Sequence, residues 1–204
     1  MTDPPPPRPI FEEPTEELER ASPDEGPLGF LLGGMANAPF ATLGAQYLKA
    51  AEVLFEQIRS RAIWDYEIAY PCLHLLRHAL ELLLKACLAP PPHGHDLGLL
   101  LAALGARLQS EHGADLPAIA QARIAEFARF DPAGIAFRYS QVRPGRSQGF
   151  GPIPLEAHVE LQHLRRTMSP ITQGLAELAQ GLRASDQPAV LLALARMGNT
   201  GSAG

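Results

Sequence analysis

Cysteine and aromatic residues are scarce in this sequence of 204 residues. The only cysteines are Cys72 and Cys87, and aromatic residues make up 6% of the chain. If one helix carries both cysteines, fifteen residues at about 1.5 Å each separate them by about 22 Å, too far for a disulfide bond. We therefore expect two buried thiols in a reducing compartment. The single Trp64 and the few other aromatic residues argue against a base-stacking surface for single-stranded nucleic acid.

Long uninterrupted apolar runs are absent as well. Arg77, Glu81 and Lys85 interrupt the most apolar stretch, so no segment reaches the ~20 residues that a membrane-spanning helix needs. The N-terminus is acidic and rich in proline, which is the opposite of the basic and apolar layout of a signal peptide. We expect a cytoplasmic protein that does not enter a membrane.

Charge is unevenly distributed along the chain. The formal net charge is −5, but the first 25 residues carry eight acidic and two basic side chains. The remaining residues are therefore close to neutral, and composition alone does not require a strongly basic surface for nucleic acid. The sequence also lacks a glycine-rich phosphate loop between a strand and a helix, and it lacks a GxSxG nucleophile motif.

The composition divides the chain into one domain with two tails. Residues 1–25 contain too few apolar side chains to offset the entropy of ordering, so we expect a disordered, acidic, proline-rich tail. Residues 26–197 form the expected single helical domain, and residues 198–204 form a second disordered tail.

Apolar residues recur at helical spacing over most of the domain, which predicts a mainly α protein. We expect an up-down bundle of four to six helices, drawn from the segments 39–61, 64–88, 97–108, 116–130, 154–182 and 188–197. Asn37 and Asp96 are the expected caps of two of these helices. Residues 73–88 are apolar nearly all round, which indicates a central helix that is buried on several sides.

The segment 131–153 differs from the rest of the domain. Apolar residues alternate with polar ones over 135–140, and glycine, proline and arginine follow up to Phe150. This pattern predicts a short β-hairpin or an irregular arm that packs on the bundle.

Three motifs in order give the chain a family resemblance. They are His78–Ala86 (HALELLLKA), then His95-Asp96-Leu97 after a proline-rich break, then Phe130-Asp131 followed by Phe137-Arg138-Tyr139. With this order and spacing, residues 40–180 resemble an uncharacterised prokaryotic branch of the HEPN-like helical proteins. The resemblance implies an antiparallel bundle, frequent homodimers, and roles in RNA cleavage, toxin–antitoxin pairs or phage defence.

The charged residues of the central helix have two interpretations. Glu81 and Lys85 are four residues apart in the order that favours a helical ion pair. Such a pair could simply fix helix packing, because a buried charge is costly unless it is paired. Alternatively, these charges belong to a polar binding pocket whose candidate residues are Arg77, His78, Glu81, Lys85, His95, Asp96, Arg138 and Tyr139. Asp96 could serve only as a helix cap.

Ribonucleases of the HEPN-like family carry an arginine and, four to six residues later, a histidine near the start of the last bundle helix. In this chain, His158 and His163 occupy that region, so a histidine stands where the family has arginine. Arg165 or Arg166 could supply the missing cation. Arg107 and His112 match the spacing numerically, but they span the end of a predicted helix elsewhere in the chain.

These observations support two functional hypotheses. The first is a HEPN-like subunit of a prokaryotic toxin–antitoxin or phage-defence system that binds RNA or a partner protein and is not a standard nuclease. The alternative is a metal-independent endoribonuclease with a diverged centre, whose candidate catalytic residues are His78, Arg138, His158 and His163. We expect a homodimer, and a partner encoded nearby or an RNA are the candidate ligands.

We expect no cofactor and no metal. A zinc site is the third and weakest hypothesis: His74 and His78 share a helix face and could bind zinc with His93 or His95, but structural zinc normally takes four ligands.

Overall fold

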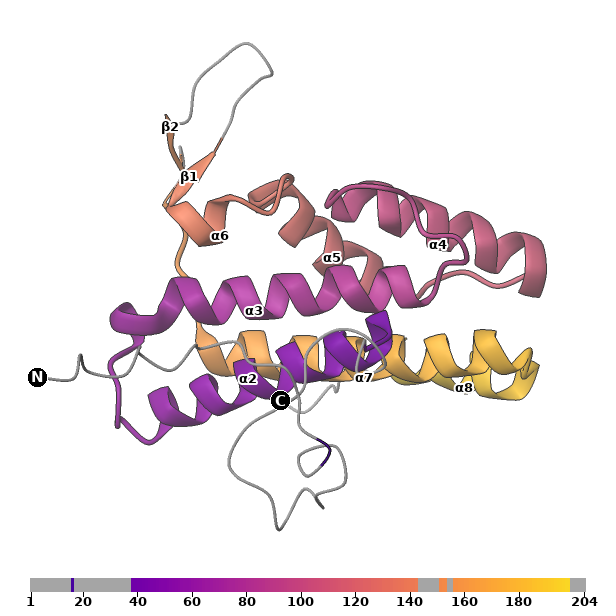
Figure 1. Cartoon of the computed structure of the whole chain (residues 1–204), viewed down its shortest axis with the longest axis horizontal. Coiled ribbons are helices and arrows are strands. Elements are labelled where there is room, and N and C mark those ends of the chain that lie inside the picture. The colour runs from indigo at the N-terminus through magenta and orange to yellow at the C-terminus, as the bar shows by residue number, and fades with distance from the viewer. Residues whose placement is uncertain (1–15, 17–37, 143–150, 154–155, 199–204) are drawn as a thin grey trace, which may run out of the picture. The chain divides into compact units, whose positions relative to one another are not determined.

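The computed structural model describes residue 16 and residues 38–142, 151–153 and 156–198 (Figure 1). Contacts divide the chain into residues 1–38 and the unit Pro39–Gly204, to which the following description refers. Most of the predicted tails, the predicted cap Asn37, the loop up to Phe150 and Pro154 lie outside the described residues.

The described part of this unit is mainly helical, as predicted. Its helices are α2 (Phe40–Arg59), α3 (Asp65–Ala86), α4 (Leu97–His112), α5 (Ala118–Phe130), α6 (Ala136–Tyr139), α7 (Leu161–Ala184) and α8 (Gln187–Gly198). Two-residue strands, β1 (Gln141–Val142) and β2 (Gly151–Pro152), pair in the antiparallel sense. Gly198 belongs to α8 and therefore not to the predicted tail.

Helix α3 is the central element. It contacts α2, α4, α6 and α7, while α8 packs on α7 and α5 (Figure 1). Its C-terminal half is buried on several sides, as its continuous apolar sequence predicts. Pro71 lies inside α3 without ending it.

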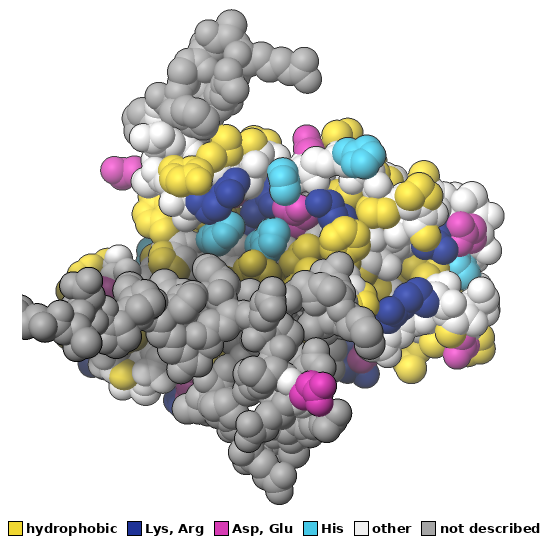
Figure 2. All heavy atoms as spheres, viewed as in Figure 1, with side chains coloured by type: hydrophobic (Ala, Val, Ile, Leu, Met, Phe, Trp, Pro, Cys, Tyr) yellow, Lys and Arg dark blue, Asp and Glu magenta, His cyan; other side chains and the backbone are white. Residues whose placement is uncertain are grey.

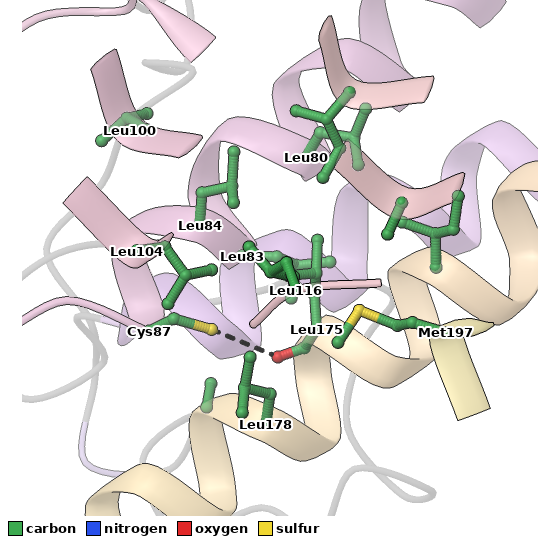
Figure 3. Packing of buried hydrophobic residues seen from close by; sticks show 14 of the residues in the cluster. Leu80, Leu83, Leu84, Cys87, Leu100, Leu104, Leu116, Leu175, Leu178 and Met197 are labelled. Atoms are coloured by element: carbon green, nitrogen blue, oxygen red, sulfur yellow. Dashed lines mark hydrogen bonds between the residues drawn. The ribbon is translucent and has the colours of Figure 1, made fainter. Parts of the chain in front are cut away.

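Leucine side chains from four helices form the core (Figure 3). Leu84 of α3, Leu104 of α4, Leu178 of α7 and Met197 of α8 are each no more than 2% exposed. Cys87 is also buried, and its thiol donates a hydrogen bond to the carbonyl oxygen of Leu175 at 3.5 Å (Figure 3). This packing surrounds α3, which carries the candidate site residues Arg77, His78, Glu81 and Lys85.

Within the segment predicted as a short β-hairpin or an irregular arm, residues 136–139 form the short helix α6, and the paired strands β1 and β2 follow it. The Asp131 carboxylate oxygen Oδ1 accepts hydrogen bonds from the backbone N–H groups of Ile135 (2.7 Å) and Ala136 (2.9 Å). Gly134, at φ +71°, turns the chain between them. These contacts favour a helical turn over the extended backbone that the alternating pattern suggests.

The last long helix begins later than predicted. It starts at Leu161 rather than near residue 154, because the side chain of Glu160 accepts hydrogen bonds from the N–H groups of Gln162 and His163 and so caps α7. His158 consequently precedes the helix, whereas His163 lies in its first turn. Only one of the two histidines therefore lies in the last long helix, whereas the prediction placed both there.

Candidate functional site around Glu81

A buried ion pair lies at the middle of α3. The side chains of Arg77 and Glu81 are 2% and 1% exposed, and Arg77 Nη1 donates to Glu81 Oε2 at 2.5 Å. The two residues are one helical turn apart, so both point from the same face of α3. Two unpaired charges at this depth would cost several kcal/mol each, on the order that desolvation of single ions costs. The buried ion pair is therefore stable only with the hydrogen-bonding and charged partners that surround it.

Three further side chains surround the Glu81 carboxylate. Lys85 Nζ lies 2.7 Å from Oε1, His95 Nδ1 lies 2.8 Å from the same oxygen, and His78 Nδ1 lies 3.8 Å from Oε2. Burial alone would raise the pKa of Glu81, but His78, Lys85 and His95 outweigh burial and hold that pKa well below its ordinary value. We name Arg77, His78, Glu81, Lys85 and His95 the Glu81 cluster.

Arg77 also connects α3 to the segment that leads into α6. Its Nη2 donates to the backbone carbonyl oxygens of His95 and Asp131, and its Nε lies 3.6 Å from Asp131 Oδ2. Asp131 is only 1% exposed. A Cβ on Gly134 would lie 3.2 Å from Arg77 Nη1, so the glycine lets the loop close tightly over the guanidinium group. One arginine thus positions both the start of α4 and the approach to α6.

Histidine and tyrosine rings continue the site along the surface of α3. The His74 and His78 rings stack with centroids 5.9 Å apart, and Tyr47 of α2 meets His78 edge-on at 4.5 Å. Burial lowers the pKa of His74, and neighbouring His78 and Arg138 lower it further. Figure 2 shows histidine and basic side chains gathered on the face where α3 passes beside α6.

Arg138 and Tyr139 border this face from α6. The guanidinium group of Arg138 lies over the Tyr139 ring at 5.4 Å, and Arg138 Nε donates to the Gly134 carbonyl oxygen at 2.6 Å. Both side chains are exposed. Gly134 thus lies between two arginines: its carbonyl oxygen accepts from Arg138, and a Cβ on it would meet the guanidinium group of Arg77.

The buried charges of the site balance one another. Arg77 and Lys85 face the carboxylates of Glu81 and Asp131. Glu81 and Arg77 are sealed inside, whereas the His95 side chain is 62% exposed and that of His78 is 27% exposed. The groups that face solvent are therefore cationic or hydrogen-bond donors, which suits an anionic ligand such as a phosphate group.

The structure separates the remaining predicted residues from this cluster. Asp96 is the N-cap of α4: its Oδ1 accepts from the N–H groups of Gly98 at 2.8 Å and Leu99 at 3.2 Å. Within the described residues, no side-chain hydrogen bond or ion pair links His158 or His163 to Glu81. Their proposed catalytic role therefore receives no geometric support from the cluster.

The arginines near His163 and His112 are occupied elsewhere. Arg165 lies 2.8 Å from Glu52 and 3.6 Å from Glu56 of α2, so a carboxylate pair already holds it. Arg107 donates to Glu111 at 2.9 Å and to the Cys87 carbonyl oxygen at 2.8 Å. In the described part of the chain, these contacts give both arginines structural roles.

Asp131, Gly134 and Tyr47 belong to the site but were not predicted as site residues. Asp131-Pro132 carries only a turn signal, and Tyr47 fits the apolar face of its helix. A hint for Asp131 was its position next to Phe130 in the third family motif. Contact with Arg77, 54 residues earlier, is a tertiary feature that local sequence does not encode.

Metal and membrane sites find no support in the residues described. No group of three or more histidine, cysteine, aspartate or glutamate side chains among them could hold a metal ion. No helix within those residues is long and apolar enough to span a bilayer. Comparisons with protein-family models, with curated proteins and with solved structures give no match.

Proposed function

We propose that this chain is a HEPN-like RNA-binding subunit of a prokaryotic toxin–antitoxin or phage-defence system, and not a standard nuclease. The observation that carries the proposal is the Glu81 cluster, in which the buried Arg77–Glu81 pair positions the exposed His95 beside the partly buried His78 and Lys85. RNA presents a phosphate at every nucleotide, and cationic or donor side chains bind phosphate oxygens.

The fixed positions of these side chains favour binding. His95 and Lys85 share one oxygen of Glu81, so neither is free to swing away from the surface. Arg138 extends the positive charge from the neighbouring arm. A preorganised set of donors loses little side-chain entropy when a ligand binds, which raises its affinity.

A standard HEPN-like nuclease centre is a poorer fit to this chain. His158 and His163 occupy the region of the family's Arg–His pair, but Arg165 is held by Glu52 and Glu56. Among the described residues, neither histidine has an ion-pair partner comparable to Glu81 beside His95.

One observation favours the alternative, a metal-independent endoribonuclease. Glu81 accepts a hydrogen bond from Nδ1 of His95, which would leave Nε2 of that exposed ring free to take or give a proton. In this version His95 and His78, rather than His158 and His163, would exchange protons with the 2′-hydroxyl and the leaving oxygen.

The proposal includes a HEPN-like up-down order of the helices, an arm in which β1 and β2 belong to one hairpin, and a cytoplasmic homodimer with a partner protein encoded nearby. Leu191 and Leu192 of α8 support a dimer, because they are 48% and 65% exposed.

The chain contains only two lysines, and they form a matched test pair. Lys85 belongs to the cluster, whereas Lys49 is exposed on α2. We expect Lys85→Gln to weaken binding of a fluorescent 12-nucleotide RNA about tenfold and to reduce the salt dependence by roughly 0.7 in the log–log slope. Lys49→Gln should bind like the parent. Equal binding by both variants would contradict the proposal, and multiple-turnover cleavage that His95→Ala abolishes would establish the alternative.

A further inference from the structure

A stripe of rings and cations runs along one side of α3. It consists of Tyr66, Tyr70, His74, His78 and Lys85, and we name it the α3 stripe. The first four are spaced by four residues, which advances about 6 Å along a helix. The stacked rings of His74 and His78, with centroids 5.9 Å apart and planes 19° apart, show this spacing directly.

The tyrosines at the start of the stripe are open to solvent. Tyr66 is 75% exposed and Tyr70 is 43% exposed, and Tyr139 of α6 is 61% exposed. The hydroxyl of Tyr70 contacts Ser140 Oγ at 3.0 Å, which places Tyr139 beside the stripe. Exposed aromatic rings interact only weakly with water. Several such rings close together therefore indicate a surface that binds another molecule.

Average composition conceals this concentration. The chain has only four tyrosines and one tryptophan, and four of these five lie on, against or at the start of α3; the fifth, Tyr139, precedes Ser140, whose hydroxyl contacts Tyr70. The low aromatic content that argued against a stacking surface is therefore gathered in one place. Arg138, over the ring of Tyr139, adds a cation to the same end.

We propose that the α3 stripe binds single-stranded RNA, with bases stacked on Tyr66, Tyr70 and Tyr139 and with phosphates held by Arg138, His78 and Lys85. This inference rests on the proposed RNA-binding function. It specifies the class of RNA that binds and the course of the bound strand along α3. Unpaired bases offer free faces to aromatic rings, whereas the bases of a duplex are already stacked on one another. The tyrosines lie at the N-terminal end of the stripe and Lys85 lies toward the C-terminal end of α3, so one strand can stack bases on the rings and place later phosphates at His78 and Lys85.

The test compares a 12-nucleotide oligo(U) RNA with a 12-base-pair RNA duplex by fluorescence anisotropy. The double variant Tyr66→Ala/Tyr70→Ala removes two rings, whereas Tyr66→Phe/Tyr70→Phe keeps the rings and removes only the hydroxyls. We expect the alanine variant to lose oligo(U) affinity about tenfold or more, and the phenylalanine variant to bind within about twofold of the parent. Val53→Ala on α2, a residue that is 49% exposed, is the control for loss of exposed apolar surface outside the stripe.

Each outcome bears on one of the two proposals. If Lys85→Gln weakens RNA binding but the alanine variant does not, or if duplex binds as well as oligo(U), the stripe inference is wrong and the RNA-binding function stands. If the parent binds neither RNA, both proposals fail. If the alanine variant loses a purified partner protein while its RNA affinity is unchanged, the surface is a protein interface. Thermal unfolding of each variant separates these losses from loss of fold.

Discussion

Glu81 is the residue on which the geometry of the site depends. Its two oxygens hold Arg77, Lys85 and His95, and Arg77 in turn holds the backbone at His95 and Asp131. A carboxylate with this many donors stabilises the fold only while it is ionised. Position 81 therefore couples the binding surface to the stability of α3.

We expect Glu81→Gln to lower the free energy of unfolding by about 3 kcal/mol at pH 7, because it leaves Arg77 buried without its carboxylate. The pKa of Glu81 lies below its ordinary value of 4.5 in the folded chain. Its contribution to stability is thus complete above that ordinary value and is lost as the pH falls toward the folded pKa. The difference between parent and variant should shrink below about pH 4.5, which urea titrations at pH 7, 5, 4 and 3 would measure. A difference that stays constant down to pH 3 would contradict the assignment.

Gly134 is the residue that lets the arm close on Arg77. It has φ +71°, and a Cβ there would meet the guanidinium group at 3.2–3.3 Å. We expect Gly134→Ala to destabilise the fold by about 1–2 kcal/mol, through left-handed backbone strain and contact with Arg77. Gly105→Ala is the control, because that helical glycine has no atom within 4 Å of the added Cβ and should stabilise by about 0.5–1 kcal/mol. Equal effects in chemical denaturation would contradict this explanation.

Among the elements, α4 is a helix whose start and end are both determined by the residues that flank it in the sequence. Asp96 caps its first turn, and Gly113 ends it at φ +60°. We expect Asp96→Ala to cost about 1 kcal/mol, whereas Asp96→Asn should cost little, because asparagine caps nearly as well. RNA affinity should be the same in both variants once they are folded. A loss of affinity in Asp96→Asn without a change in stability would instead place Asp96 in the binding site.

The sequence predicted those elements whose determinants are local. The apolar run of α3, the cap of α4 and the Glu81–Lys85 pairing follow from periodicity, capping and four-residue spacing. Helix α6 and the start of α7 were not predicted, because Asp131 and Glu160 decide them through hydrogen bonds to backbone N–H groups.

The assembly of the site was only partly visible in the sequence. His95 was a candidate pocket residue, and its Nδ1 lies 2.8 Å from the Glu81 carboxylate, whereas Arg138 bonds to the Gly134 carbonyl oxygen. The contacts of Arg77 with Asp131 and Gly134 join segments more than fifty residues apart, and no local pattern reports such contacts.

At the scale of the whole molecule, the two cysteines report on two parts of α3, because Cys72 lies in its N-terminal half and Cys87 is its C-cap. Cys72 and Cys87 are both fully buried and unpaired, and burial raises the pKa of each thiol to about 12. The Cys87 thiol also donates a hydrogen bond to the Leu175 carbonyl oxygen of α7, whereas Cys72 lies in the core within the N-terminal half of α3. A thiol in this state reacts only when the surrounding core opens, since the thiolate is the reactive form.

We therefore expect neither thiol to react with a disulfide reagent such as DTNB in the native protein at pH 8, and both to react within the dead time in 6 M guanidinium. Each of the single variants Cys72→Ala and Cys87→Ala leaves one thiol. That thiol should be labelled slowly in the native protein, and at the same rate in both variants. Both rates should rise together in Glu81→Gln, because both would follow global unfolding. If Cys72 reacts much faster than Cys87, the N-terminal half of α3, which carries Tyr66 and Tyr70, opens separately from the leucine core. In that case the part of the α3 stripe that carries the tyrosines would open locally in the free protein, and a bound ligand would hold it closed.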